Sequence, residues 1–310
     1  MARGARAASS GTVLVGISAW TEPTLVKAGT FYPKKTMSAE ERLRFYASQF
    51  PVAEVDSTYY APPTVRNAEL WIERTPKDFV FDIKAFALLT GHPARIDRLP
   101  KDLAEELPKE LLAKKNVYRD TAPGEWVDEV WERFREALFP LHSAGKLGVV
   151  LFQFPQWFLP GRSSKDYLAE CAERLSDYRV AIEFRHQSWL SEKNAERTLA
   201  FLEEHDLPLV CVDMPQGFDS SMPALAAATA KDVAVVRFHG RDPGAWSDTG
   251  GTAADRFRYD YSKGELQEWA PRIEEMAAQA RETHVIMNNC YRDFAVKSAR
   301  QMASLLDLDE

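Results

Sequence analysis

Short apolar runs rich in β-branched residues recur along the chain, and most are separated by segments with helical patterning. Runs of this kind are typical of strands buried on both faces, as parallel strands beneath helices are. We therefore interpret eight of them as strands. They are Val13–Ala19, Val52–Thr58, Phe79–Ala85, Leu147–Pro155, Tyr178–His186, Leu207–Pro215, Asp232–Gly240 and Thr283–Cys290.

The segments between the runs show helical periodicity. Ser38 and Glu41 form a capping-box pattern, and apolar residues then recur at helical spacing from Leu43 to Phe50. The weakest helical pattern is at Ala224–Ala230, between the sixth and seventh runs. Strands alternating with helices predict an α/β fold, a (β/α)₈ TIM-like barrel. An open doubly wound sheet is the structural alternative.

The barrel is expected to form a single domain over residues 11–310, preceded by a disordered tail at 1–10. Residues 86–146 separate the third and fourth runs by far more than one crossover needs. They contain a charged helical pattern near Lys101–Lys114 and an amphipathic one near Glu125–Leu141. We predict a helical insertion over the barrel mouth, acting either as a lid or as a buttress.

Composition narrows the class of protein. Hydrophobic residues make up 45% of the 310 positions and charged residues 27%, a balance typical of globular enzymes. The net charge of −7 gives no overall field that attracts nucleic acid or anionic membranes. No segment approaches the ~20 apolar residues of a membrane-spanning helix, and the start lacks the apolar stretch of a secretory signal. Three widely spaced cysteines form no metal or disulfide pattern, which favours a reducing, cytoplasmic location.

Nearly every run becomes polar towards its C-terminal end, where barrel active sites lie. Alternate residues of a strand share one side, and unpaired charge is costly to bury, so these residues are the candidates for function. The candidate catalytic residues are Glu54, Lys84, Glu183, Asp213 and His239. The candidate substrate-binding residues are Trp20, Tyr59, Gln153, Arg185, Trp189, Arg237, Asn288 and Asn289.

A structural interpretation competes with the functional one. The acidic residues could merely neutralise Lys84, Arg185 and Arg237 in an ion-pair network, and tryptophans that follow strands more often pack than bind. For the ring as a whole we favour a ligand site, because ligand sites concentrate at this rim.

Nine short motifs occur in order along the chain. They are GISAW (Gly16–Trp20), FYP (Phe31–Pro33), AEVDSTYY (Ala53–Tyr60), FDIKA (Phe81–Ala85), LFQFP (Leu151–Pro155), AIEFRHQSW (Ala181–Trp189), RFHGR (Arg237–Arg241), YDYS (Tyr259–Ser262) and MNN (Met287–Asn289). Through them the chain resembles the domain of unknown function 72 family. The resemblance implies a TIM-barrel-like fold and a pocket at the strand ends, but no established reaction.

Two positions depart from that family's pattern. The family usually has an aromatic residue before the paired asparagines and often a histidine after them, where this chain has Met287 and Cys290. Its Thr-His pair after the third strand appears here as Thr90-Gly91-His92. The roles of Cys290 and His92 are therefore left open.

The leading functional hypothesis is sugar isomerase or epimerase chemistry. Xylose-isomerase-like barrels place Glu, Asp, His and Glu around a divalent metal, and Glu183, Asp213 and His239 end comparable strands here. By this positional analogy they would hold Mg²⁺, Mn²⁺ or Zn²⁺, which would polarise a carbonyl. Glu54 or Lys84 would then move the proton.

Two other hypotheses differ in class. In the first, a metal-free hydrolase or lyase clamps a phosphate- or carboxylate-bearing substrate with Lys84, Arg185 and Arg237. In the second, the barrel binds a ligand without turnover. All three predict a small-molecule partner, such as a sugar or a phosphate. Nucleic acid is disfavoured, since the only basic-aromatic run is short, at Arg256–Tyr261. The oligomeric state is left open.

Overall fold

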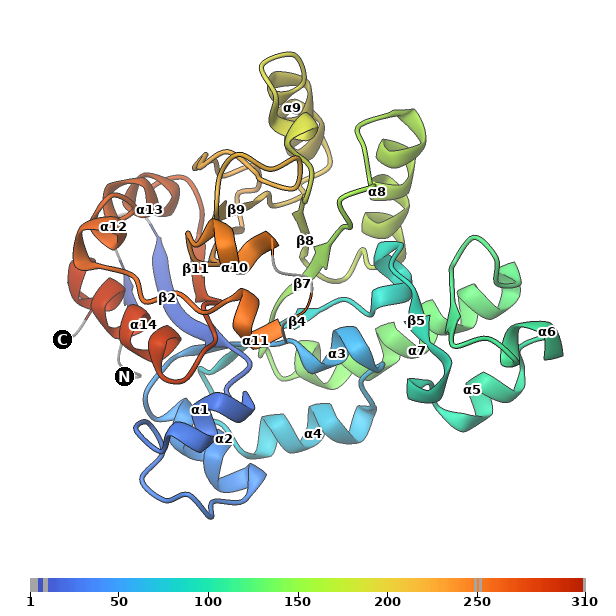
Figure 1. The fold of residues 1–310 in the computed structure, drawn as a ribbon, viewed down its shortest axis with the longest axis horizontal. Helices are drawn as coiled ribbons and strands as arrows, with labels where there is room; N and C mark the ends of the chain where they lie inside the picture. Colours follow the sequence, from blue (N-terminus) through green and yellow to red (C-terminus); the bar gives the residue numbers. More distant parts are fainter. Residues whose placement is uncertain (1–4, 8–10, 248–249, 251–252, 309–310) are drawn as a thin grey trace.

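The computed structural model describes residues 5–7, 11–247, 250 and 253–308, and it confirms a barrel-like sheet of eight parallel strands (Figure 1). Neighbouring strands follow the order β8-β7-β4-β3-β2-β11-β10-β9. The ends of this order meet through one bridge, Ile182 to Leu209, so the barrel is nearly closed. The strands are β2 (Thr12–Ser18), β3 (Val52–Val55), β4 (Val80–Lys84), β7 (Leu147–Gln153), β8 (Val180–Glu183), β9 (Val210–Asp213), β10 (Val233–Phe238) and β11 (Glu282–Met287).

Helices surround the strands on the outside (Figure 1). The expected capping box starts α2: the Ser38 amide donates to Glu41 Oε2 at 2.6 Å, and the Glu41 amide donates to Ser38 Oγ at 3.2 Å. Besides the segment between β4 and β7, the helices are α1 (Pro23–Ala28), α2 (Ala39–Ala47), α3 (Ser57–Tyr60), α4 (Val65–Glu73), α8 (Arg162–Arg174), η3 (Gln187–Leu190), α9 (Ala195–Glu204), α10 (Pro243–Ser247), α11 (Ala253–Arg256), α12 (Lys263–Gln267), α13 (Ala270–Ala277) and α14 (Phe294–Leu305).

The long segment between β4 and β7 has two parts. Its second part is the 20-residue helix α7 (Gly124–Ser143), which packs against α4 and β7 as an ordinary crossover helix does. In its first part the expected charged helix is split in two, because Pro108 precedes a new helix start. Trp126 Nε1 of α7 donates to Leu103 O at 2.8 Å and fixes the first part to α7. The first part contains η1 (Ala87–Thr90), β5 (Ala94–Arg95), η2 (Ile96–Arg98), α5 (Lys101–Glu105), α6 (Lys109–Leu112) and β6 (Asn116–Val117).

Two sequence-based expectations are wrong. Residues 214–232 are all described and contain no helix, so the one expected at Ala224–Ala230 is absent. Instead, Thr229 Oγ1 accepts from the Leu209 amide at 2.7 Å and covers the edge of the barrel beside β9. Within the expected tail, β1 (Ala5–Ala7) pairs antiparallel with β2, while the rest of the tail lies outside the described residues.

Register fixes which polar residues share a level of the barrel. Ser18 of β2 lies opposite Glu54 of β3, and Glu54 lies opposite Asp82 of β4. Gln153 of β7 lies opposite Glu183 of β8. The C-terminal ends of these strands therefore bring polar side chains from distant parts of the chain to one rim.

A second charged pair lies inside the barrel, between β11 and β4. His284 Nδ1 of β11 is 2.9 Å from Asp82 Oδ1, and both side chains are almost completely buried. Gly148 makes room for this pair, since a Cβ there would lie 2.2 Å from Asp82 Oδ1. Burial lowers the pKa of His284, but Asp82 and then Glu282 raise it more, to about 9. His284 is therefore a buried imidazolium at neutral pH.

No helix in the described ranges is long and apolar enough to cross a membrane. Cys171, Cys211 and Cys290 are all free thiols and all buried.

The buried imidazolium predicts a pH-dependent stability. The pKa of His284 in the folded protein lies above the value of about 6.5 in an unfolded chain. The contribution of its charge to folding stability is therefore complete below about pH 6.5 and is lost as the pH rises through about 9. Between about pH 6.5 and about pH 9 we expect the free energy of unfolding of the wild type to fall by about 3 kcal/mol more than that of His284→Gln. Urea unfolding at several pH values measures this. The exposed His142→Gln variant should keep the wild-type slope, and parallel slopes for wild type and His284→Gln would refute the assignment.

Candidate functional site

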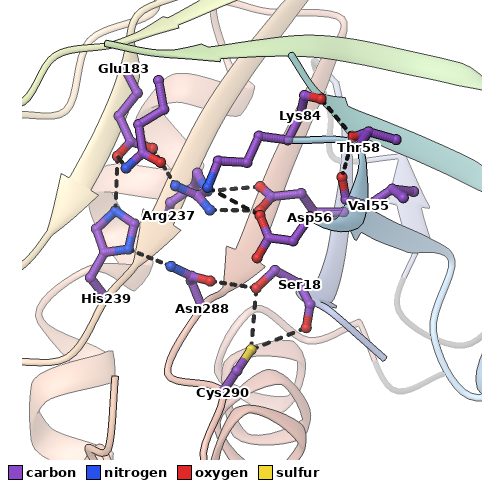
Figure 2. Close-up of polar contacts among 12 residues, drawn as sticks. Ser18, Val55, Asp56, Thr58, Lys84, Glu183, Arg237, His239, Asn288 and Cys290 are labelled. Carbon is purple, nitrogen blue, oxygen red and sulfur yellow. Dashed lines mark hydrogen bonds and ion pairs between the residues drawn. The ribbon is translucent and has the colours of Figure 1, made fainter. Parts of the chain in front are cut away.

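The rim at the C-terminal strand ends is organised around Arg237 of β10, whose side chain has no solvent exposure. Its Nε and Nη2 donate to the two carboxylate oxygens of Glu54 at 2.8 and 2.6 Å. Its Nη1 donates to Glu183 of β8. Figure 2 shows Arg237 between Glu183 and His239 on one side and Lys84 and Asp56 on the other. A single guanidinium thus joins three strands spaced around the barrel.

Glu183 is bonded by several side chains of this rim. It accepts from Gln153 Nε2 at 3.0 Å and from Arg185 Nε at 2.6 Å, and it lies 3.3 Å from His239 Nε2. Burial opposes its ionisation, but Arg185 and Arg237 outweigh burial and hold the pKa of Glu183 well below its usual value. Glu183 is therefore a fixed negative charge that orients its neighbours.

Glu54 and Asp56 form a pair of carboxyl groups with separated pKa values. Burial raises the pKa of Glu54 to about 8 against the attraction of Arg237, and Asp56 adds to the rise. For Asp56, burial is outweighed by Lys84 and Arg237, which lower its pKa. The Lys84 ammonium is 3.2 Å from Asp56 Oδ1, and a quarter of the Asp56 side chain is exposed. The two carboxyl groups therefore differ in protonation near neutral pH, Glu54 being protonated and Asp56 ionised.

A chain of hydrogen bonds links His239 to β2 (Figure 2). Ser18 Oγ donates to Asn288 Oδ1 at 2.5 Å, so the Asn288 amide nitrogen is left to donate to His239 Nδ1 at 2.8 Å. Cys290 Sγ is 3.2 Å from Ser18 Oγ. This network assigns the imidazole proton to Nε2, facing Glu183. Burial, together with Arg185, lowers the pKa of His239 to about 3, so the ring is neutral.

Two adjoining cavities open at this rim. The first, here called the apolar cavity, has a volume of about 580 Å³ and the second, the cationic cavity, about 500 Å³. Both are lined by Tyr60, Lys84 and Phe257, so Lys84 stands on their common boundary. Asp56, Asn288 and Cys290 line the apolar cavity, together with Trp20, Leu43, Val55 and Trp71.

The cationic cavity combines cations with aromatic walls. Lys84, Arg185 and Arg256 line it, and its described lining contains no acidic residue. The Arg185 guanidinium lies 5.2 Å from the ring centre of Trp246, and the Lys84 ammonium lies 4.9 Å from that of Tyr59. Gln153 and Trp157 also contribute to the wall. Such a cavity suits an anion attached to a flat or apolar group.

His92, which the sequence left open, belongs to the same wall. Its Nδ1 is 2.8 Å from Thr90 Oγ1, and its ring packs edge-on against Tyr59 and Trp157. Burial, then Lys84 and Arg185, lower the pKa of His92 to about 4, so it is neutral at physiological pH. It is the one residue of the segment 86–146 that lines either cavity.

Asp213 does not lie with the other candidates. Its carboxylate accepts from Arg241 Nη2 at 2.8 Å, from Tyr261 Oη at 2.6 Å and from Trp269 Nε1 at 2.6 Å. Tyr261 and Trp269 flank α12, and Arg241 lies just after β10, so all three partners lie outside the strands. The expected set of Glu183, Asp213 and His239 is therefore not assembled. Among the described residues no group of three or more His, Cys, Asp or Glu side chains is placed to hold a metal, so these residues do not fit the expected divalent ion.

Three further candidates have structural roles. Trp189 is fully buried, stacks on Phe184 at 4.1 Å between ring centres, and donates from Nε1 to Phe158 O. Asn289 points away from Asn288 and donates to Tyr259 O at 2.9 Å. Arg237 contacts carboxylates only from the interior and lines neither cavity. The expectation that these three bind substrate directly is wrong.

Sequence reasoning missed several cavity residues. Asp56 shares parity with Glu54 and lies in the AEVDSTYY motif, so a signal for it was present. Arg256 and Phe257 come from the short basic-aromatic run, which was considered only for nucleic acid. Tyr60 follows the candidate Tyr59 directly.

The fold and rim define an α/β barrel with a polar, ligand-accessible site at the C-terminal ends of its strands. Residues 14–310 match the family model described as "Protein of unknown function DUF72", and the chain belongs to that family. It is 32% identical to the UPF0759 protein YunF of Bacillus subtilis, over 96% of this chain and 95% of that protein. A DUF72 crystal structure from Thermotoga maritima has a TM-score of 0.73 at 28% identity, covering 95% of this chain and 99% of that one. One from Enterococcus faecalis has a TM-score of 0.77 at 24% identity, covering 96% of each.

Arg237 predicts a large and specific loss of stability. In Arg237→Gln, Glu54 and Glu183 would keep their buried positions without the cation that joins them. We expect the free energy of unfolding to fall by about 3–5 kcal/mol at neutral pH, as measured by urea denaturation. The matched surface variant Arg66→Gln should cost less than about 1 kcal/mol. A loss in Arg237→Gln no greater than in Arg66→Gln would contradict the central role of Arg237.

Proposed function

We propose that this barrel is an acid–base enzyme, of the hydrolase or lyase class, that acts on a small anionic substrate bound in the cationic cavity. The observation that carries the proposal is the lining of that cavity: Lys84, Arg185 and Arg256 face it, and no acidic residue does in its described lining. The chain as a whole carries a net charge of −7, so this local excess of cations is not an average property of its surface.

Binding would use the cations in different ways. Glu183 holds Arg185 through Nε, at 2.6 Å, and Arg185 Nη2 lies 3.4 Å from His239 Nε2, so the guanidinium plane is fixed. A fixed guanidinium suits the paired oxygens of a phosphate or a carboxylate. Lys84 supplies a point charge on the opposite side of the rim, and exposed Arg256 adds a charge at the entrance.

Proton transfer would use the carboxyl pair beside Lys84. Asp56, ionised and partly exposed, would take a proton from the substrate or from an attacking water. Glu54 lies behind Asp56 and holds a proton near neutral pH, so it would tune the charge of Asp56 without touching the substrate. Lys84, 3.2 Å from Asp56, would stabilise negative charge that develops next to the bound anion. His239 and Asn288 would act as positioning residues for Glu183 and Ser18.

Isomerase or epimerase chemistry through a divalent metal loses its support in the geometry. The three expected ligands do not meet, because Asp213 is bonded to Arg241, Tyr261 and Trp269. The proposed reaction therefore uses no metal held by Glu183, Asp213 and His239, and Asp56 is the proposed proton acceptor.

A matched pair of arginine variants tests the binding site. Arg256 lines the cationic cavity, whereas Arg258, two residues further along the same exposed segment, does not and lies over the ring of Tyr291. By calorimetry we expect Arg256→Gln to weaken inorganic phosphate binding about fivefold, and Arg258→Gln to change it less than about twofold. If the two variants weaken phosphate binding equally, Arg256 acts only as a surface charge and not as part of the site. If the wild type does not bind phosphate, the proposal is wrong.

The carboxyl pair predicts how anion binding depends on pH. While Glu54 is protonated, this group of side chains carries one net positive charge. The cations are Arg185, Arg237 and Lys84, and the ionised carboxylates are Glu183 and Asp56. As pH rises through about 8, Glu54 ionises and this charge is lost. Sulfate keeps its charge over that range, so we expect its affinity to fall roughly fivefold between about pH 7 and pH 9.

The control for this pH dependence is Glu54→Gln, in which the amide cannot ionise. Its sulfate affinity should stay level across the same range at constant ionic strength. If sulfate affinity still falls with pH in Glu54→Gln, another group causes the fall, and the proposed role of Glu54 in anion binding is wrong.

A further inference from the structure

The apolar cavity is not needed to bind an anion, yet it opens onto the same rim. Tyr60, Lys84 and Phe257 line both cavities, so a molecule bound in one can extend past Lys84 into the other. Asp56, the expected base, lines the apolar cavity beside this boundary. The reacting groups therefore lie between two compartments of different chemistry.

We propose that the substrate has two parts: an anionic group held in the cationic cavity and an aromatic or short aliphatic group held in the apolar cavity, with the reacting bond beside Lys84 and Asp56. This inference rests on the proposed function and narrows its substrate class to small organic acids, such as aryl or alkyl phosphates and carboxylates.

The apolar walls are already formed. Trp20 packs against Tyr46 and Phe81, at 6.2 Å between ring centres in both cases. Trp71 packs on the same Phe81 at 5.9 Å. Leu43 of α2 completes this side of the cavity. Because these rings are held by the core, an apolar guest would bury surface without first ordering the wall.

Most polar groups of the apolar cavity are already satisfied by the protein. Glu22 Oε2 accepts the amides of Thr24 and Leu25 at the start of α1. Asn288 bonds both Ser18 and His239. Such groups do not require a polar partner from a ligand.

Asp56 and Arg74 are the exceptions among these polar groups. Arg74 Nε is buried without a hydrogen-bond partner and lies 3.5 Å from Glu40 Oε2 as an ion-pair partner. Asp56 Oδ1 is buried and accepts no hydrogen bond, although Lys84 lies 3.2 Å away as an ion-pair partner. A quarter of the Asp56 side chain is exposed, and its partner Lys84 lines both cavities, so Asp56 lies beside the place where the proposed reacting bond would be held.

The size of the cavity allows a ring. A cavity of roughly 150 Å³ is enough for benzene, and the apolar cavity has a volume of about 580 Å³. Ala19, which lines it, has a left-handed backbone with φ of 52°, a conformation that is unfavourable for alanine. This turn at the end of β2 directs the chain so that Trp20 enters the cavity wall, and local strain of this kind often accompanies ligand sites.

Calorimetry with inorganic phosphate and phenyl phosphate tests the proposal in the wild-type protein. The two ligands share the anionic group, and only phenyl phosphate carries a ring. We expect phenyl phosphate to bind about tenfold tighter or more, because the ring leaves water for the apolar cavity.

Filling the apolar cavity from its exposed edge should remove this gain. Ala39 and Asn67 line the cavity from α2 and α4, and both side chains are exposed, so tryptophan at either position leaves the core unchanged. In Ala39→Trp and in Asn67→Trp we expect phenyl phosphate to bind no tighter than phosphate, with phosphate affinity as in the wild type. The control Ala113→Trp, at an exposed position that lines neither cavity, should retain the full gain.

The outcomes separate this inference from the proposed function. If phosphate binds but phenyl phosphate binds no tighter in the wild type, or if the gain survives in both tryptophan variants, the two-part substrate is wrong while the anion site stands. If neither ligand binds the wild type, the anion site fails and the two-part substrate fails with it.

Discussion

One buried guanidinium determines how the top of this barrel is built. Arg237, on β10, joins Glu54 of β3 to Glu183 of β8. The side chains that contact these two glutamates are therefore arranged around Arg237. Two strands separate β3 from β8, two separate β3 from β10, and one separates β8 from β10. Removing ionised groups from water is costly, and only complete pairing offsets that cost. The network is therefore satisfied only when all three strands are in register.

The same constraint separates the charges that face a ligand from those that do not. Glu183 and Arg237 are enclosed and form an ion pair, whereas Arg185 and Lys84 line the cationic cavity and are paired with Glu183 and Asp56. The structural interpretation of the polar ring thus applies to its interior residues, and the functional interpretation is a proposal for the residues that line the cavities. An interior ion-pair network supports an outer layer of side chains that are free to meet a substrate.

The sequence allowed the strands, their order and most of the rim to be predicted, since buried parallel strands and their polar ends leave a clear pattern. It could not show the direction of side chains at or just past a strand end. Asp213 is the last residue of β9 and bonds outward to Tyr261 and Trp269, which lie far along the chain. Asp56 follows β3 in the turn to α3, and the parity that it shares with Glu54 could not show that Asp56, and not Glu54, lines the apolar cavity. The alanine-rich stretch before β10 has helical propensity, but Thr229 instead bonds to the edge of β9.

The boundary between β8 and β9 differs from the other seven. Each of the seven other pairs of adjacent barrel strands is joined by a ladder of at least three residue pairs. β8 and β9 are joined by one bridge and by the amide of Ile182, which donates to Pro208 O. Arg185 follows β8 directly, beside this boundary. Fewer backbone hydrogen bonds must be broken to widen the barrel here than anywhere else on its circumference. The barrel is consequently held together by the fewest backbone hydrogen bonds beside β8, the strand that ends at Glu183 and is followed two residues later by Arg185.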